Sequence, residues 1–461
     1  KDKSRGFSYH GNPKSVTAYY VHTDDNLREH EETLADFGSL LPSKIWARRS
    51  HFLSPAMKLK IDKQPAVKHI HASDLGMVDD VGTSGCGFID DQYLEDLLGN
   101  TSEAKRSLGI QVRIFVPTKG VFKGMLMRKR NVTGEPIQLN ESLMKVAPSR
   151  SAASDNGYIV IKKTFPSKDN FIVGRLFQSP EVLHKKRLKP ITELKGFKNS
   201  LKKEDSCKLS GMHERVLKGI GVPKEMIEQY RNQYKNDPKK LCHTHVVGMA
   251  DPTMQIPPKS VFVTGAMNSI DRLYITRSPC LEAEDGRVVK VARTKPDEMT
   301  HDAWGWLQSL SFGAVIFGNP GRGQRPLPEL IAEGDLDGDL YFICWDENVL
   351  SHIYPVPITD EELLLPVGSV TKQREYDPEW FMKTQKFISQ VPSMHLGIDE
   401  LVGRCYKKSE AFSDIRHPDG VSFARAYKQA LDAKKHGKLI ILPSHLWDHV
   451  PKKLHKYLVS D

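Results

Sequence analysis

The chain has 461 residues, a length typical of roughly two to four domains, and its 39% hydrophobic and 27% charged content is that of a globular protein. It contains no apolar run of about 18 residues and no apolar signal segment near Lys1, so we expect neither a membrane partner nor a secretory leader. The six cysteines form no CxxC pair, which argues against a disulfide framework or a ribbon-type zinc site and favours an intracellular location, nucleus or cytoplasm. The net charge of +10 favours a polyanionic partner such as nucleic acid. Because the chain does not begin with Met, we interpret it as part of a longer protein.

The first part of the chain changes from mixed to β-rich character. Residues 1–78 form an N-terminal flanking region in which 28–37 has helical spacing. Across 79–180, short β-branched runs such as IQVRIFV (110–116) and GYIVIKKTF (157–165) are separated by Gly, Pro, Asn and Asp. This pattern predicts an irregular β domain.

A lysine-rich segment separates this β domain from a second one. Residues 181–245 have helical spacing, and VLKGIGVPKEMIEQYRNQY (216–234) predicts two helices joined by a turn. This basic connector is either a track for nucleic acid or a solvated helical face. Short strands return across 246–372, including LYFICW (340–345), and 373–461 is mostly helical.

The stretch EGDLDGDLYFICWDE (333–347) carries the strongest chemical signal. Asp335, Asp337 and Asp339 alternate over five residues, so in extended or turn geometry their side chains project to one side. Three like charges at close range are costly unless a cation neutralises them. Gly338 lets the backbone bend, and a ligand set made only of oxygen suits Mg²⁺, with Mn²⁺ as the alternative. Such a site suits phosphoryl transfer.

Three other interpretations fit this stretch less well. An EF-hand loop needs Gly at its sixth position and Glu at its twelfth, where this chain has Leu340 and Asp346. A phosphatase of the haloacid dehalogenase type has its nucleophilic Asp after a strand, whereas here the apolar strand follows the motif. A solvated acidic turn would not need three alternating Asp beside an apolar strand. The metal site is therefore the favoured interpretation.

The segment GDLDGDLYFICWD closely resembles the metal-binding signature of the eukaryotic RNA-dependent RNA polymerases of RNA silencing. Further segments resemble the same family in the same order, from about residue 80 to the end. They are SGCGFID (84–90), IQVRIFVPTKGVFKG (110–124), IQLNESLMKVAPS (137–149), LKGIGVPKEMIEQY (217–230), VVGMADPTMQIPPKSVFVT (246–264), YITRSPCLEAEDGRVVKVA (274–292) and ALDAKKHG (430–437).

This resemblance implies an α+β fold with two double-psi β-barrels, a helical connector and a helical C-terminal region. The barrels would occupy 79–180 and 246–372, with the active site in the cleft between them. The implied reaction is RNA-templated nucleotide transfer from NTPs, which makes double-stranded RNA for silencing from a single-stranded RNA template. Single-stranded DNA stays open as a second template, and proteins of the silencing pathway are the expected partners.

The resemblance also implies roles for particular residues. Asp335, Asp337 and Asp339 would hold the catalytic metal, and Lys123 and Lys145 would face them across the cleft and neutralise phosphate charge. The remaining candidates would bind substrate or nucleic acid: Lys119 (also an alternative counterpart of Lys123), Arg277 (alternatively a structural ion pair), Arg322, Arg325 and Lys435.

The chain departs from the family pattern in two places. Glu333 lies just before the acidic motif, where the family often has small residues, and either perturbs metal binding or faces solvent. The family's His-Pro-Asn-Glu-like stretch is LPEL (327–330) here. Two rival functions stay open: a two-barrel polymerase that prefers a DNA template, and a catalytically silent RNA-binding module that kept the fold.

Overall fold

The computed structural model describes two β-rich parts and the helices at the C-terminal end. The described residues are 7–12, 15–20, 27–52, 67–79, 82–152, 154–165, 223–225, 228, 243–265, 270–277, 280–321, 323–345, 347–351, 353, 356–364, 375–412, 416–436 and 438–460. The predicted basic connector, 181–245, and the two helices predicted at 216–234 lie almost entirely outside them. Within these residues, no helix is long and apolar enough to cross a membrane.

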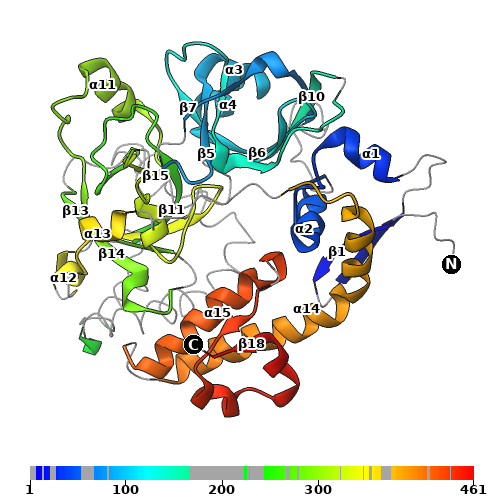
Figure 1. Cartoon of the computed structure of the whole chain (residues 1–461). Helices are drawn as coiled ribbons and strands as arrows, with labels where there is room; N and C mark the ends of the chain where they lie inside the picture. Colours follow the sequence, from blue (N-terminus) through cyan, green and yellow to red (C-terminus); the bar gives the residue numbers. More distant parts are fainter. Residues whose placement is uncertain are drawn as a thin grey trace, which may run out of the picture.

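The fold combines mixed β-sheets with helices (Figure 1), which is the α+β class predicted from the sequence. The first sheet has eight strands: β3 (Val67–His71), β4 (Leu75–Met77), β5 (Cys86–Asp90), β6 (Gly109–Val116), β7 (Gly120–Lys129), β8 (Ile137–Leu139), β9 (Met144–Val146) and β10 (Asn156–Phe165). The second is a closed barrel of β11 (His243–Ala250), β12 (Ser260–Val263), β13 (Arg272–Arg277), β14 (Gly286–Val291), β15 (Ala314–Phe317) and β16 (Leu340–Cys344). The described α-helices are α1 (Leu27–Leu34), α2 (Pro42–Phe52), α3 (Asp91–Leu97), α4 (Ser102–Arg106), α11 (His301–Ser309), α12 (Glu347–Leu350), α13 (Asp360–Leu363), α14 (Trp380–Ala411) and α15 (Pro418–His436). Two small sheets complete the fold: β1 (Phe7–Asn12) pairs with β2 (Ser15–Tyr20), and β17 (Ile440–Ile441) pairs with β18 (Leu458–Val459).

The first sheet is mixed and has the strand order β3-β10-β6-β7-β5-β8-β4, with β9 paired to β7. Its centre is the antiparallel pair of β6 and β7, in which Arg113 lies opposite Lys123. Alternate residues of β6 have different surroundings, as expected for a strand. Ile110, Val112 and Ile114 enter the core of this sheet, while the residues between them lie on its other face. That other face is the one that carries Gln111 and Arg113.

The second barrel closes in the order β11-β15-β12-β14-β13-β16. Strands β11 and β15 are parallel, and so are β12 and β14, while the other neighbours are antiparallel. Tyr341 on β16 is fully buried and its ring lies edge-on to that of Phe317, with 5.0 Å between the ring centroids. The acidic stretch therefore leads directly into a strand that is fixed in the barrel wall.

One apolar cluster joins the two β structures. Phe88, Met125 and Met127 of the first sheet belong to the same buried cluster as Val247 and Leu336 of the second part. Burying such side chains is worth about 1.5–3 kcal/mol each, so this cluster fixes how the two sheets face one another. The site described below lies at this junction.

The two long helices, α14 and α15, run alongside each other (Figure 1). The helical segments predicted at the end of the chain are thus confirmed, with a small addition, the parallel pair of β17 and β18. Helix α2 contacts both α14 and α15. Its Ile45 is fully buried in a cluster with Phe115, Val121, Val146 and Trp380, so α2 lies between α14 and strands β6, β7 and β9.

Candidate active site

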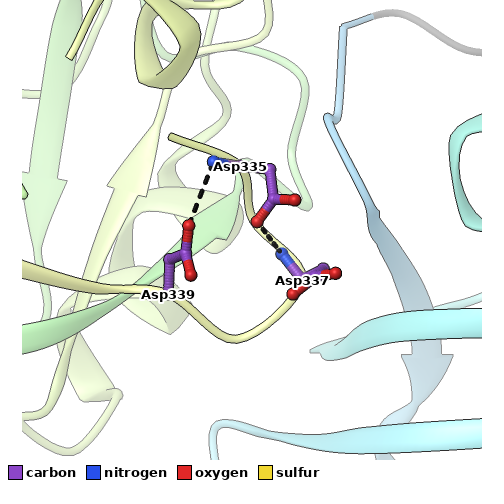
Figure 2. Close-up of side chains that lie close together, drawn as sticks. All are labelled: Asp335, Asp337 and Asp339. Carbon is purple, nitrogen blue, oxygen red and sulfur yellow. Dashed lines mark hydrogen bonds between the residues drawn. The ribbon is translucent and has the colours of Figure 1, made fainter. Parts of the chain in front are cut away.

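Three carboxylates converge in the loop that precedes β16. Asp335, Asp337 and Asp339 each offer a carboxylate oxygen, and these oxygens lie within 4.8 Å of one another. Figure 2 shows the loop folded on itself: the Asp337 N–H donates to Asp335 Oδ1 at 3.3 Å, and the Asp335 N–H donates to Asp339 Oδ2 at 3.3 Å. Among the described residues, this is the one group of three or more metal-ligating side chains.

Close packing determines the shape of this loop. Gly338 has φ +125°, a conformation that L side chains rarely adopt, and an added Cβ would overlap the side chain of Gln111. Leu336 is buried between the flanking aspartates, and the Tyr341 hydroxyl donates to the Asp335 carbonyl at 3.0 Å. Because an apolar side chain anchors the loop between two of its carboxylates, the three aspartates point the other way.

The first sheet holds the acidic loop across the junction. The Leu336 N–H donates to the Ser84 carbonyl at 2.7 Å, and Gln111 Nε2 donates to the Asp337 carbonyl at 2.9 Å. Lys123 Nζ, on β7, forms an ion pair with Asp337 Oδ2. Lys123 thus lies beside the acidic cluster, although it is more than two hundred residues away in the chain.

On the other side of the loop, Arg277 at the end of β13 pairs with the third carboxylate. Its Nε lies 2.6 Å from Asp339 Oδ2, and its Nη1 donates to the Ala332 carbonyl at 3.0 Å. Of the two roles weighed for Arg277, this placement favours the structural ion pair. Contact with nucleic acid stays a prediction for this residue.

The carboxylates differ in their electrostatic surroundings. Burial, followed by the negative charges of Asp337 and Asp339, raises the pKa of Asp335 to about 7. Burial also acts to raise the pKa of Asp337, but the charge and hydrogen bond of Lys123, with Lys145 and Arg113, outweigh it and lower that pKa. The charged form of Asp335 is therefore disfavoured in the free protein, and a cation bound between the three carboxylates would stabilise it.

This donor set fits a divalent metal ion. All three side chains offer carboxylate oxygens, the ligands that hard divalent cations prefer, and each is partly exposed. The preceding Glu333 is exposed and lies outside the cluster. Of the two roles weighed for Glu333, its exposure favours the one in which it faces solvent.

The remaining predicted residues have different surroundings. Lys145 on β9 is largely buried, its Nζ donates to the Ser142 carbonyl, and burial lowers its pKa to about 8. Lys119 lies in the turn between β6 and β7, and Arg325 Nη2 donates to the Glu329 carbonyl at 3.2 Å. Arg322 lies outside the described residues, as does the side chain of Lys435 in α15, so their roles stay predictions.

The sequence did not single out Gln111, which holds the main chain of the acidic loop. Its signal was available, because it begins the Gln-Val-Arg run of a β-strand whose alternation directs it away from the sheet core. The sequence does not reveal the hydrogen-bond partner of Gln111, because the Asp337 carbonyl is 226 residues away along the chain.

Replacing Gln111 with alanine should weaken divalent metal binding about tenfold or more, because groups that orient metal ligands typically contribute that much. The variant removes the hydrogen bond to the Asp337 carbonyl and opens space beside Gly338. Calorimetric titration with Mn²⁺ measures the effect. Gln138→Ala is the matched control, since Gln138 Nε2 donates to Thr133 at 3.3 Å in the same sheet, and equal affinities in the two variants would contradict the role of Gln111.

Comparisons with known proteins identify the family to which the chain is similar. A family model described as RNA dependent RNA polymerase matches residues 206–457, more than half of the chain. RNA-dependent RNA polymerase 1 of Arabidopsis thaliana is 25% identical over 202 residues, which are 44% of this chain and 16% of that protein. Probable RNA-dependent RNA polymerase 4 of the same plant is 23% identical over 400 residues, covering 75% of this chain and 41% of that protein.

A solved structure shares the fold. RNA dependent RNA polymerase QDE-1 from Thielavia terrestris matches with a TM-score of 0.57 and 13% identity, covering 98% of this chain and 57% of that one. The chain thus spans less than half the length of the two curated relatives and somewhat more than half of the solved one.

Proposed function

Because the chain belongs to the RNA-dependent RNA polymerase family, we propose that it is an RNA-directed RNA polymerase that adds nucleotides from NTPs to an RNA 3′-end. The template would be single-stranded RNA and the product double-stranded RNA, made for RNA silencing in the nucleus or cytoplasm with proteins of that pathway as partners. Both β structures would be double-psi barrels. The observation that carries this proposal is the convergence of Asp335, Asp337 and Asp339 opposite Lys123.

The residues of this junction have complementary tasks in such a reaction. Asp335, Asp337 and Asp339 would bind Mg²⁺, with Mn²⁺ as the alternative. When bound, the metal would supply Lewis-acid activation of the 3′-hydroxyl and stabilise the charge of the leaving pyrophosphate. Lys123 and Lys145 would neutralise phosphate charge in the transition state. Gln111 would hold the acidic loop in place against the first sheet through its hydrogen bond to the Asp337 carbonyl.

The direct test is template-directed incorporation of a labelled nucleotide. The purified chain would be incubated with single-stranded RNA, four NTPs and Mg²⁺, with EDTA in a parallel reaction and single-stranded DNA as a second template. Metal-dependent product whose sequence complements the RNA supports the proposal. RNA binding without product from a folded chain would favour the catalytically silent module, and product from DNA alone would favour a DNA-directed enzyme.

Lys145 should give the reaction a characteristic pH dependence. Since burial lowers its pKa to about 8, the free protein loses this positive charge as the pH rises through about 8. We expect kcat/KM for NTP, which reports the free enzyme, to fall over that range. Lys145→Arg stays charged, so its kcat/KM, normalised to the value at pH 7, should stay level. Identical profiles for the two proteins would rule out this role.

A further inference from the structure

A second group of cations lies beside the acidic loop, and part of it comes from a helix outside both β structures. In α2, Ile45, Arg48 and His51 recur every three residues and so share one side of the helix. Ile45 packs against Phe115 and Val121, which places this side of α2 over strands β6 and β7.

The strands beneath α2 carry cations of their own. Arg113 on β6 is 8% exposed and lies directly opposite Lys123 on β7. Two like charges at opposed positions of neighbouring strands destabilise a sheet unless an anion lies between or above them. Lys145 on the adjoining β9 adds a third positive charge at about neutral pH.

These guanidinium groups have unused donors. Arg48 Nη1 lies 3.3 Å from His51 Nε2, and Arg113 Nη1 donates to the Val112 carbonyl at 3.0 Å. The Nε atoms of both arginines are buried and have no hydrogen-bond partner among the residues that the structure describes. A buried cationic donor without a partner costs considerable free energy, which an anionic ligand would recover.

The charges around this group support the same conclusion. The carboxylate that acts on both Arg48 and Arg113 is Asp337, which is already paired with Lys123. Burial, together with Arg113, Arg48, Lys123 and Lys145, lowers the pKa of His51 to about 2, so this imidazole is neutral and accepts from Arg48 instead of adding charge.

We propose that Arg48 of α2, together with Arg113 and Lys145, binds a phosphate group beside the acidic loop, and that His51 is a positioning residue which orients Arg48. Guanidinium groups bind phosphate oxygens in a bidentate manner, and the free Nε atoms provide donors for it. The phosphate belongs either to the incoming NTP or to an RNA strand. This assignment of α2 rests on the proposed polymerase function.

Binding of tripolyphosphate, followed by calorimetry in EDTA, tests the site without requiring catalysis. We expect Arg48→Gln to bind about tenfold more weakly than the parent chain, as for loss of a charged hydrogen-bonding group, and Arg48→Lys to lie between them because it keeps the charge but loses the fork. Arg404→Gln is the matched control, since Arg404 is exposed on α14 and pairs with Glu400 at 2.9 Å. Unchanged affinity in a folded Arg48→Gln protein would overturn the proposal.

Two variants separate positioning by His51 from a merely structural role. His51→Gln keeps a neutral acceptor for Arg48 and should retain the affinity for tripolyphosphate, whereas His51→Leu should bind tripolyphosphate several-fold more weakly. Both proteins should unfold at similar temperatures. If both variants lose affinity equally, His51 does not act through this hydrogen bond.

Two further measurements on Arg48→Gln identify the source of the phosphate. A higher KM for NTP with unchanged RNA affinity assigns it to the nucleotide, and weaker RNA binding with a shallower salt dependence assigns it to the strand. If no nucleotide is incorporated by any form of the chain, the polymerase function fails, while the tripolyphosphate result still decides the site.

Discussion

Replacing Asp337 with asparagine should lower nucleotide incorporation by about a thousandfold or more, since a catalytic metal contributes several kcal/mol to transition-state stabilisation. The asparagine side chain would keep the shape of the aspartate and leave the main-chain hydrogen bond from Gln111 intact, but it would lose the charge that pairs with Lys123. The loss should therefore come from metal binding and charge balance, with the loop still in place. Steady-state incorporation on an RNA template, together with Mn²⁺ titration, measures both quantities.

The control for this variant is Glu333→Gln, which makes the same change of charge and shape two residues before the acidic cluster. Glu333 is exposed and is not among the three clustered carboxylates, so its activity should stay within about twofold of the parent. Activity of Asp337→Asn above about a tenth of the parent value would contradict a metal-binding role for Asp337.

Replacing Lys428 with methionine should lower the free energy of unfolding by about 3–5 kcal/mol, the typical cost of removing one partner from a buried ion pair. Lys428 on α15 is almost fully buried, and its Nζ lies 2.9 Å from Glu282 Oε1 and 2.5 Å from Asp285 Oδ1. Both carboxylates belong to the segment between β13 and β14. Burial raises the pKa of Asp285, and the positive charge of Lys428 acts in the opposite direction. Without Lys428, the buried Asp285 carboxylate would lose the main charge that stabilises it. This cluster therefore attaches α15 to the second barrel.

The same helix offers a close control. Arg425 lies three residues before Lys428 and pairs with the same Glu282 at 3.1 Å, but its side chain is 65% exposed. Arg425→Met should therefore cost less than about 1 kcal/mol, as exposed ion pairs do. Urea unfolding followed by circular dichroism compares the two variants. Equal losses would mean that burial does not decide the strength of these pairs.

Local patterns in the sequence predicted the acidic cluster and many of the strands and C-terminal helical segments, but not α2 or strands β1 to β4 in the first 78 residues. The helices at 380–411 and 418–436 follow from the spacing of their apolar residues, and the strands from short β-branched runs. The three aspartates are separated by single residues, so their spacing alone indicates that their side chains lie on one side of the chain. The resemblance to a family added Lys123, which the structure places on Asp337.

Tertiary structure decided everything that depends on distant partners. The Arg277 side chain could equally have met nucleic acid or a carboxylate, and the folding of β13 beside β16 brought it to Asp339. In the sequence, nothing distinguishes Arg48 and Lys428 from the other lysines and arginines, of which the chain has 67 in total and most of which fit an ordinary basic surface. Their positions emerge only because α2 and α15 pack on β structures that lie far from them in the sequence.

The sequence by itself thus indicated which carboxylates gather and, from residue 79 onward, many of the segments that become helix or strand, because those outcomes depend on spacing within a few residues. The tertiary structure alone decided which cations face the carboxylates, which donors are left without a partner and which ion pairs are buried. The physical reason is that burial and long-range charge interactions depend on how two β structures and three helices pack together, and no local spacing encodes that arrangement.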